Sequence, residues 1–249
     1  MTALLTLDNV SRRFGGLKAV DDVSFSVDKG EIVGLIGPNG AGKTTLINII
    51  TGVHPATSGR VHFEDADITR AKPHQIAQRG LARTFQIVQP FPRMTVVENV
   101  AAGALFCGHA HGVREAQEIA REHLAFTGLT DVADRPASSL TLARRKRLEL
   151  AKGLAMRPRL LMLDEVNAGL NQTEVDDALA IIRKIAEQGV TILVIEHLMK
   201  VVLSVSHRLL VLHHGQLIAQ GTPREVVSDQ RVIEAYLGAK YAAQRGAVH

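Results

Sequence analysis

The 249-residue chain has no tryptophan, a single cysteine and few aromatic residues, which make up 4% of it. One thiol, Cys107, cannot form an intrachain disulfide or a cysteine-based metal cluster, which suits a reducing compartment. We expect Cys107 to be buried and unreactive. No uninterrupted run of about 18 apolar residues occurs, and the first residues lack the apolar centre of a signal peptide. These absences predict a cytoplasmic protein.

Strong charge of one sign is also missing. The chain has 29 Lys and Arg against 25 Asp and Glu, a net charge of +4 that is spread along the sequence. Such a mild excess is compatible with an anionic membrane surface and does not indicate nucleic-acid binding. The 46% hydrophobic and 22% charged composition is typical of a globular protein with a packed core. The length fits one large domain, or one domain with an inserted subdomain.

Four short runs are apolar on both faces and are separated by longer amphipathic stretches. They are EIVGLIG at 31–37, LLMLDE at 160–165, TILVIEH at 191–197 and RLLVLHH at 208–214. Runs of this kind are typical of buried strands in a largely parallel sheet with helices on both sides. The pattern predicts an α/β nucleotide-binding core.

Two other patterns depart from that core. The first thirty residues and the segment GRVHFEDADI at 59–68 alternate apolar and polar residues, which predicts a small antiparallel β-subdomain. Between about 88 and 155 the spacing is helical and strand formers are few, which predicts an inserted helical subdomain. The whole chain, 1–249, is then one domain. Its core with the β-subdomain lies at about 1–87 and 156–240, the helical subdomain at 88–155 and the tail at 241–249.

The segment GPNGAGKTT matches the phosphate-binding pattern G-x-x-x-x-G-K-[ST], and it lies between a predicted strand and a predicted helix. Its glycines let the backbone wrap closely around phosphate oxygens at the positive end of that helix. Lys43 is placed to neutralise the β- and γ-phosphates, Thr44 to bind Mg²⁺, and Thr45 to donate to a phosphate oxygen. The residues expected to bind nucleotide here are Gly37, Pro38, Asn39, Gly40, Ala41, Gly42, Lys43, Thr44 and Thr45. The loop alone leaves kinase, GTPase and ATPase open.

The strand LLMLDE ends in two adjacent carboxylates. At the carboxyl end of a buried strand, Asp164 is placed to hold Mg²⁺ through water, and Glu165 to polarise the water that attacks the γ-phosphate. Together with the loop, this pair predicts a protein that binds and hydrolyses ATP with Mg²⁺.

With these motifs in place, the chain resembles the ATPases of ABC transporters over residues 4 to 239. The resemblance implies that Phe14, in VSRRFGG, stacks on adenine. It implies that Gln86, in ARTFQ, touches Mg²⁺ and the attacking water, and that His197, after TILVIE, contacts the γ-phosphate. The segment 168–171, AGLN, matches the family's loop that crosses to a second subunit. Asn171 with Glu174 in addition has the pattern of a helix N-terminal capping pair.

The signature segment departs from the family, which usually has LSGGQ where this chain has LTLAR at 140–144. By resemblance, Thr141 and Ala143 belong to the helix start that closes over nucleotide bound by the opposite subunit. Thr141 keeps a hydroxyl, but Leu142 and Ala143 replace both glycines, so a backbone needing positive φ would be strained. Two readings stay open: a divergent but working signature, or a weakened one compensated by a different partner ATPase.

A basic run follows the signature, RRKR at 144–147. Leu148, Ala151, Leu154 and Ala155 give the same segment an apolar helical face. We therefore expect the basic run to be a solvated face or a partner contact and not a site for RNA or DNA.

The local text resembles one branch of the family, the ATPases of branched-chain amino acid importers, whose relatives also take up urea or short amides. The segments that carry this are ARTFQIVQPFPRMTVVENV, RKRLELAKGLA, LDEVNAGLNQTE and GTPREVVSDQRVIEAYLG. The resemblance implies a second ATPase subunit, identical or different, two transmembrane permease subunits, and indirectly an extracytoplasmic solute-binding protein. It also implies a place on the inner face of the cell membrane.

In the mechanism that the resemblance implies, two subunits sandwich two ATP molecules, and closure moves the region around Gln86 and 87–99 against the membrane subunits. Three alternatives remain: a lipopolysaccharide-export ATPase, a soluble ABC protein of translation or DNA repair, and a regulatory module that does not hydrolyse ATP. The chain has no second ATPase domain, coiled-coil insertion or zinc-binding insertion of the kind that soluble ABC proteins carry.

Overall fold

The computed structural model describes residues 3–85, 90–107, 110–196 and 199–237. By its internal contacts the chain divides into two compact units. The first comprises Met1–Pro73 and Leu193–His249, and the second comprises His74–Ile192. Within the described residues, no helix combines the length and the hydropathy that a membrane crossing requires.

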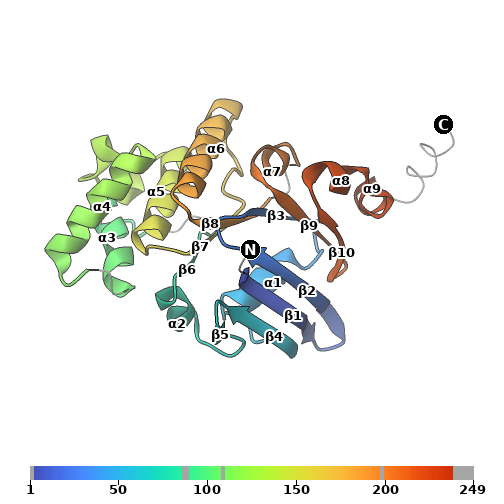
Figure 1. The fold of residues 1–249 in the computed structure, drawn as a ribbon. Coiled ribbons are helices and arrows are strands. Elements are labelled where there is room, and N and C mark those ends of the chain that lie inside the picture. The colour runs from blue at the N-terminus through green and yellow to red at the C-terminus, as the bar shows by residue number, and fades with distance from the viewer. Residues whose placement is uncertain (1–2, 86–89, 108–109, 197–198, 238–249) are drawn as a thin grey trace. The chain divides into compact units, whose positions relative to one another are not determined.

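An antiparallel sheet forms the N-terminal part of the first unit. Its strands are β1 (Ala3–Phe14), β2 (Leu17–Asp28), β4 (Ser58–Phe63) and β5 (Ala66–Asp67), in the order β2-β1-β4-β5 (Figure 1). All its neighbouring strands pair antiparallel. The alternation of apolar and polar residues matches this sheet most clearly in β4, where Val61 and Phe63 are buried and His62 between them is not. The predicted β-subdomain is confirmed.

The other strands of the first unit run in the order β10-β9-β3-β8. Strand β3 (Ile32–Ile36) is buried at every residue and pairs in parallel with β9 (Arg208–His213), which forms an antiparallel hairpin with β10 (Gln216–Gly221). Strand β8 (Thr191–Ile195) begins in the second unit and ends in the first. Strands β3 and β8 are buried at every residue and β9 at its four central residues, as expected for a largely parallel sheet, whereas β10 is mostly uncovered.

Four helices complete the described part of the first unit: α1 (Lys43–Ile50), α7 (Met199–Val205), α8 (Pro223–Ser228) and α9 (Gln230–Leu237). Side chains of α7, α8 and α9 pack with β3 and β9 into one apolar cluster. Its buried members are Ile36, Val202, Leu209, Val211, Ala219, Val226 and Val232. The cluster fixes the end of β3, where the phosphate-binding motif begins.

The second unit contains two parallel strands, β6 (Leu81–Arg83) and β7 (Leu160–Asp164), and the long helix α6 (Gln172–Glu187). Helix α2 (Pro73–Gln78) leads into β6. Strand β7 and the C-terminal position of Asp164 were predicted from LLMLDE. Strand β6 was not predicted, because its three residues are too few to show a period.

The helical part of the second unit consists of α3 (Val96–Phe106), α4 (Val113–Thr127) and α5 (Leu142–Ala155), which lie together in Figure 1. Two short 3₁₀ helices, η1 (Thr130–Val132) and η2 (Ala137–Ser139), connect α4 to α5. Their core includes Val100, Ala120, Leu124, Leu148 and Ala151, all fully buried. The helices expected between 88 and 155 are present, while the domain boundaries given above stay a prediction.

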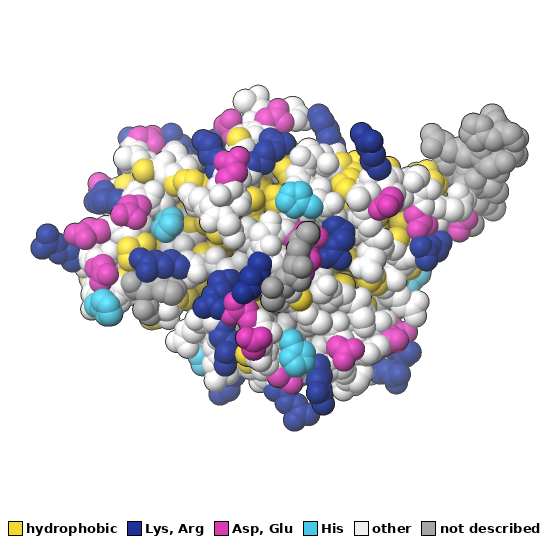
Figure 2. All heavy atoms as spheres, in the orientation of Figure 1, with side chains coloured by type: hydrophobic (Ala, Val, Ile, Leu, Met, Phe, Trp, Pro, Cys, Tyr) yellow, Lys and Arg dark blue, Asp and Glu magenta, His cyan; other side chains and the backbone are white. Residues whose placement is uncertain are grey.

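Charged side chains of both signs are mixed over the face seen in Figure 2. This agrees with the small net charge of the sequence. On the visible face, Lys and Arg side chains alternate with Asp and Glu, so it has no broad field of one sign.

Candidate functional site

The phosphate-binding motif of the first unit forms the loop between the end of β3 and the start of α1. Three of its glycines have positive φ: 153° at Gly37, 77° at Gly40 and 103° at Gly42. A side chain at Gly37 would collide with the carbonyl oxygen of Leu212, and one at Gly42 with that of Ala19. The loop is therefore closely wrapped, and only glycine fits at both positions.

Lys43 is the first residue of α1 and is buried. Its ammonium donates to the carbonyl oxygens of Gly37, at 2.6 Å, and of Pro38, at 3.1 Å. Gly42, the N-terminal cap of α1, offers no side-chain cap, so the positive end of the helix is open to another acceptor. The glycine backbone, the cation and the helix start fit a polyphosphate.

The two threonines of the motif differ in exposure. Thr44 is exposed and Thr45 is half-buried, both in the first turn of α1. A hydroxyl at this place is an oxygen donor of the kind that Mg²⁺ takes. The role of each threonine stays a prediction.

Phe14 closes β1 in the first unit and is 41% exposed. The guanidinium carbon of Arg12 lies 4.6 Å from the centre of its ring, and the ring of His54 meets it edge-on at 5.6 Å. Arg12 also donates to the carbonyl oxygen of Pro55 at 2.9 Å. The exposed ring is available for stacking, and its role toward adenine stays a prediction.

Asp164 ends β7 in the second unit and is 5% exposed. Its carboxylate lies 2.7 Å from the guanidinium of Arg83, at the end of the neighbouring strand β6. Its backbone N–H donates to the hydroxyl of Thr84 at 3.2 Å. Arg83 and Thr84 were not among the residues predicted for the site, although both lie in ARTFQ, just ahead of Gln86.

Glu165 follows Asp164 with a φ of 48°, in the left-handed region that residues with a side chain seldom adopt. Its carbonyl oxygen accepts from the N–H of Ala168 at 3.2 Å and from the ammonium of Lys146 at 3.0 Å. Lys146 comes from α5 and is only 5% exposed. The structure therefore supports the unusual backbone of Glu165 from a second element.

This contact corrects the interpretation of the basic run at 144–147 for one of its members. Arg144 pairs with Asp131, and Arg147 with Asp177, as partly exposed ions. Lys146 is neither solvated nor free, since its ammonium is directed inward onto Glu165. The physical reason is helical periodicity, which puts it on the buried side of α5.

The signature segment forms a regular helix start. Thr141 is the N-terminal cap of α5, and its hydroxyl accepts from the N–H of Arg144 at 3.4 Å. Leu142 and Ala143 lie in the helix, and neither has positive φ, so the strain considered for them is absent here. A few residues after Glu165, the predicted pair of Asn171 and Glu174 forms the complete capping box of α6.

Two expected catalytic residues, Gln86 and His197, lie outside the described residues. Residues 87–89, part of the segment expected to meet the membrane subunits, and the tail at 241–249 do so too. Cys107, expected to be buried, is only partly so, and burial raises the pKa of its thiol. A raised pKa disfavours the reactive thiolate, as expected of an unreactive cysteine.

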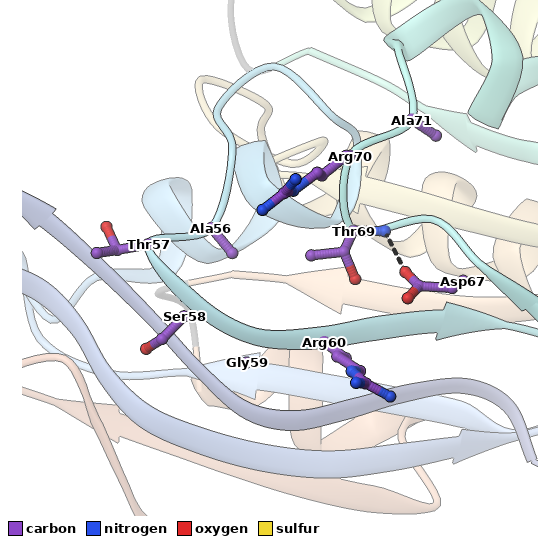
Figure 3. A pocket seen from close by; sticks show the side chains of 9 residues that line it. All are labelled: Ala56, Thr57, Ser58, Gly59, Arg60, Asp67, Thr69, Arg70 and Ala71. Atoms are coloured by element: carbon purple, nitrogen blue, oxygen red, sulfur yellow. Dashed lines mark hydrogen bonds between the residues drawn. The ribbon is translucent and has the colours of Figure 1, made fainter.

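A shallow pocket of about 500 Å³ lies on the antiparallel sheet of the first unit. Its lining comes from β4, from β5 and from the segments beside them (Figure 3): Ala56, Thr57, Ser58, Gly59, Arg60, Asp67, Thr69, Arg70 and Ala71. The side chains of Arg60 and Arg70 do not point toward one another, and Asp67 accepts from the backbone N–H of Thr69 at 2.9 Å. Cations that do not converge make no anion site, so the pocket is not part of the candidate site.

Known proteins of similar sequence and structure cover nearly the whole chain. The ABC transporter family model matches residues 20–168, and a branched-chain amino acid ATP-binding cassette transporter model matches residues 216–242. The branched-chain amino acid transport ATP-binding protein BraF of Pseudomonas aeruginosa is 41% identical, over 94% of this chain and 98% of its own length. LivG of Escherichia coli K12, a protein of the same description, is 40% identical over 94% and 98%.

Solved structures agree with the expected fold. A nucleotide-free ATP-binding cassette from an ABC transporter is 36% identical, with a TM-score of 0.86 over 94% of this chain and 99% of its own. The ADP conformation of an ATP-binding cassette, also 36% identical, has a TM-score of 0.87 over 96% and 100%. The α/β fold predicted for the sequence is confirmed. On its family-model match, its relatives and its fold, the chain belongs to the ABC transporter family.

Proposed function

We propose that this chain is the ATP-hydrolysing subunit of an ABC importer for branched-chain amino acids. The observation that carries the ATP-binding part is the loop between β3 and α1, where three glycines of positive φ wrap the backbone closely and the ammonium of Lys43 lies on the loop carbonyls at a helix start. The transport part is supported by relatives such as BraF and LivG, whose names describe branched-chain amino acid transport.

In nucleotide binding, the first unit supplies the groups that receive the phosphates. Lys43 exchanges its bonds to the carbonyls of Gly37 and Pro38 for bonds to the β- and γ-phosphate oxygens, which are stronger because the acceptor is ionised as well as the donor. The N–H groups of the loop and of the first turn of α1 donate to the remaining oxygens. Phe14 offers its exposed ring to the adenine base.

Mg²⁺ fits the donors that the chain presents, because it prefers hard oxygen ligands and keeps several waters. The hydroxyl of Thr44 and the carboxylate of Asp164 are such donors, and Gln86 adds an amide oxygen. When bound, the ion neutralises charge on the β- and γ-phosphates. Asp164 is held in place by Arg83 and by the bond from its own N–H to Thr84.

In hydrolysis, Glu165 accepts a proton from the attacking water, and His197 and Gln86 position that water and the γ-phosphate. The left-handed backbone at Glu165, fixed by Lys146 and by the N–H of Ala168, sets the direction in which the carboxylate leaves the turn. Catalysis of this kind is mostly positioning, so a rigid turn favours it.

Two such subunits are proposed to bind beneath permease subunits on the inner face of the membrane, with an extracytoplasmic solute-binding protein delivering the cargo. Each nucleotide would lie between one subunit's phosphate loop and the other's signature helix. The regular, Thr141-capped start of α5 supports a working signature over a weakened one. It also favours an importer ATPase over a regulatory module that does not hydrolyse ATP.

Uptake of labelled leucine tests the proposal directly. Cells lacking this chain should import leucine slowly, and the wild-type chain should restore import while Lys43→Ala and Glu165→Gln should not. A pull-down on the wild-type chain should recover permease subunits. Leucine uptake unchanged by the deletion, with loss of ATP binding in Lys43→Ala, would refute the cargo while leaving the ATPase intact.

A further inference from the structure

The signature helix α5 contacts residues 165–169 of its own subunit, here called the Glu165 turn, at two points. The ammonium of Lys146 donates to the carbonyl oxygen of Glu165 at 3.0 Å. Four residues earlier, a methyl group of Leu142 lies so close to Gly169 that a β-carbon built there would be 2.9 Å from it. Residues four apart share one face of a helix, so one face of α5 meets both ends of the segment 165–169.

Each contact belongs to a residue that departs from an expectation. Leu142 takes the place of a signature glycine and remains 47% exposed, yet its methyl group lies directly on Gly169, which has a φ of 79°. Lys146 lies in a basic run but is buried, and it bonds the carbonyl of Glu165, a residue that has a side chain and yet a left-handed backbone. A buried ammonium is costly unless it is hydrogen-bonded, so this contact is held firmly.

We infer that Leu142 and Lys146 hold the signature helix and the Glu165 turn together so that the two move as one rigid body. In this arrangement Lys146 is a positioning residue for Glu165. The inference rests on the proposed function for its consequence. The start of α5 faces the nucleotide of the partner subunit, while Glu165 serves the nucleotide of its own. Engagement of the signature helix by one nucleotide would then fix the geometry of Glu165 at the other.

This arrangement gives the divergent signature a definite role. A glycine at position 142 has no side chain with which to reach Gly169, whereas leucine fills that space without needing positive φ. Compared with the glycine usual in the family, Leu142 restricts the backbone at the helix start and adds a contact with the loop that follows Glu165. Coupling between the two sites is then a property of α5 itself, because a packed helix moves as a rigid element.

The experiment compares Lys146→Met with Lys146→Arg and with the control Arg147→Met. Arg147 neighbours Lys146 in the same run but pairs with Asp177 of α6 at 2.7 Å, away from the Glu165 turn. Lys146→Met should lower kcat on the order of 10- to 100-fold with little change in KM, because Glu165 is misplaced while nucleotide binding is retained. Lys146→Arg should restore part of the loss, and Arg147→Met should behave like wild type.

Hydrogen exchange gives a second readout that does not depend on turnover. In Lys146→Met the backbone amides of the turn, Ala168 foremost, should exchange roughly tenfold faster, since the turn loses a charged hydrogen bond. Leu142→Ala should have a smaller effect, and the double variant should differ from the sum of the two singles. Equal kcat and equal exchange in Lys146→Met and Arg147→Met would overturn the inference. If the wild-type chain hydrolyses no ATP, the proposed function fails, and the hydrogen-exchange comparison of Lys146→Met with Arg147→Met still tests the present inference.

Discussion

The carboxylate of Asp164 and the guanidinium of Arg83 form an ion pair 2.7 Å long at the ends of two neighbouring parallel strands. Both side chains are nearly buried, 10% exposed for Arg83 and 7% for Asp164. Asp164, which is proposed to hold Mg²⁺, is thus neutralised by Arg83, three residues ahead of Gln86. The pair ties the segment leading to Gln86 to the strand leading to Glu165.

Removing the cation should destabilise the chain. Arg83→Met leaves the buried carboxylate of Asp164 without its ionic partner, which costs about 3–5 kcal/mol for pairs of this type. Urea unfolding measures the loss, and Arg83→Lys should recover part of it. The control is Arg121→Met, which breaks an exposed pair with Asp134 of similar length, 2.8 Å, and should cost about 0–1 kcal/mol. Equal losses in the two variants would contradict the importance given to burial.

The phosphate loop should not tolerate a side chain at Gly42. A methyl group there would collide with the carbonyl of Ala19 and would force a residue with a side chain to a φ of 103°. Gly42→Ala should therefore destabilise the chain by about 1–3 kcal/mol and abolish the thermal stabilisation that ATP gives.

Gly16→Ala is the matched control, because Gly16 has open space around it and is not among the residues of positive φ. It should unfold and bind ATP as the wild type does, as a thermal shift assay with and without ATP would measure. Full ATP stabilisation in Gly42→Ala would show that the loop adapts around nucleotide more than its geometry suggests.

Acid should lower the free energy of unfolding through Glu31, which directly precedes β3 and pairs with Arg208 at the start of β9. Burial alone would raise the pKa of Glu31, but the bonds from Arg208, 2.8 Å away, and from the N–H of Asp28 outweigh it and lower that pKa below its ordinary value. Because the pKa of Glu31 is lower in the folded chain than in the unfolded chain, the ionised Glu31 stabilises the fold fully above the unfolded pKa of about 4.3. This stabilisation disappears as the pH falls through the pKa of the folded chain.

Glu31→Gln isolates this dependence. The difference in unfolding free energy between wild type and variant should be constant near neutral pH and should shrink once the pH falls below about 4.3. Urea titrations at a series of pH values measure it. A difference that stays level, or that grows with acid, would contradict the assigned ion pair with Arg208.

Much of the fold was predictable because its signals are local. Strands such as β3 and β7 are apolar on both faces, and GPNGAGKTT, 37–45, specifies a loop between strand and helix in consecutive residues. Asn171 and Glu174 predicted their capping box for the same reason. In each case the residues that interact lie within a few positions of one another.

The residues that were missed interact over long distances in the sequence. Arg83 and Asp164 meet because β6 and β7 are neighbours, and no spacing in the chain announces that pairing. Lys146 had a usable signal: it lies four residues after Leu142 and four before the buried Leu150, so helical periodicity places it on the inner side. Its positive charge, read as part of a basic run, outweighed that signal.

The central claim, that Glu165 carries out ATP hydrolysis on nucleotide held by the Lys43 loop, is tested most directly by single-turnover hydrolysis of radiolabelled ATP. The wild type, Glu165→Gln and Lys43→Ala should be compared at saturating protein. Glu165→Gln should bind ATP as tightly as the wild type and hydrolyse it at least about 100-fold more slowly, while Lys43→Ala should bind poorly. Hydrolysis by Glu165→Gln at the wild-type rate would contradict the account.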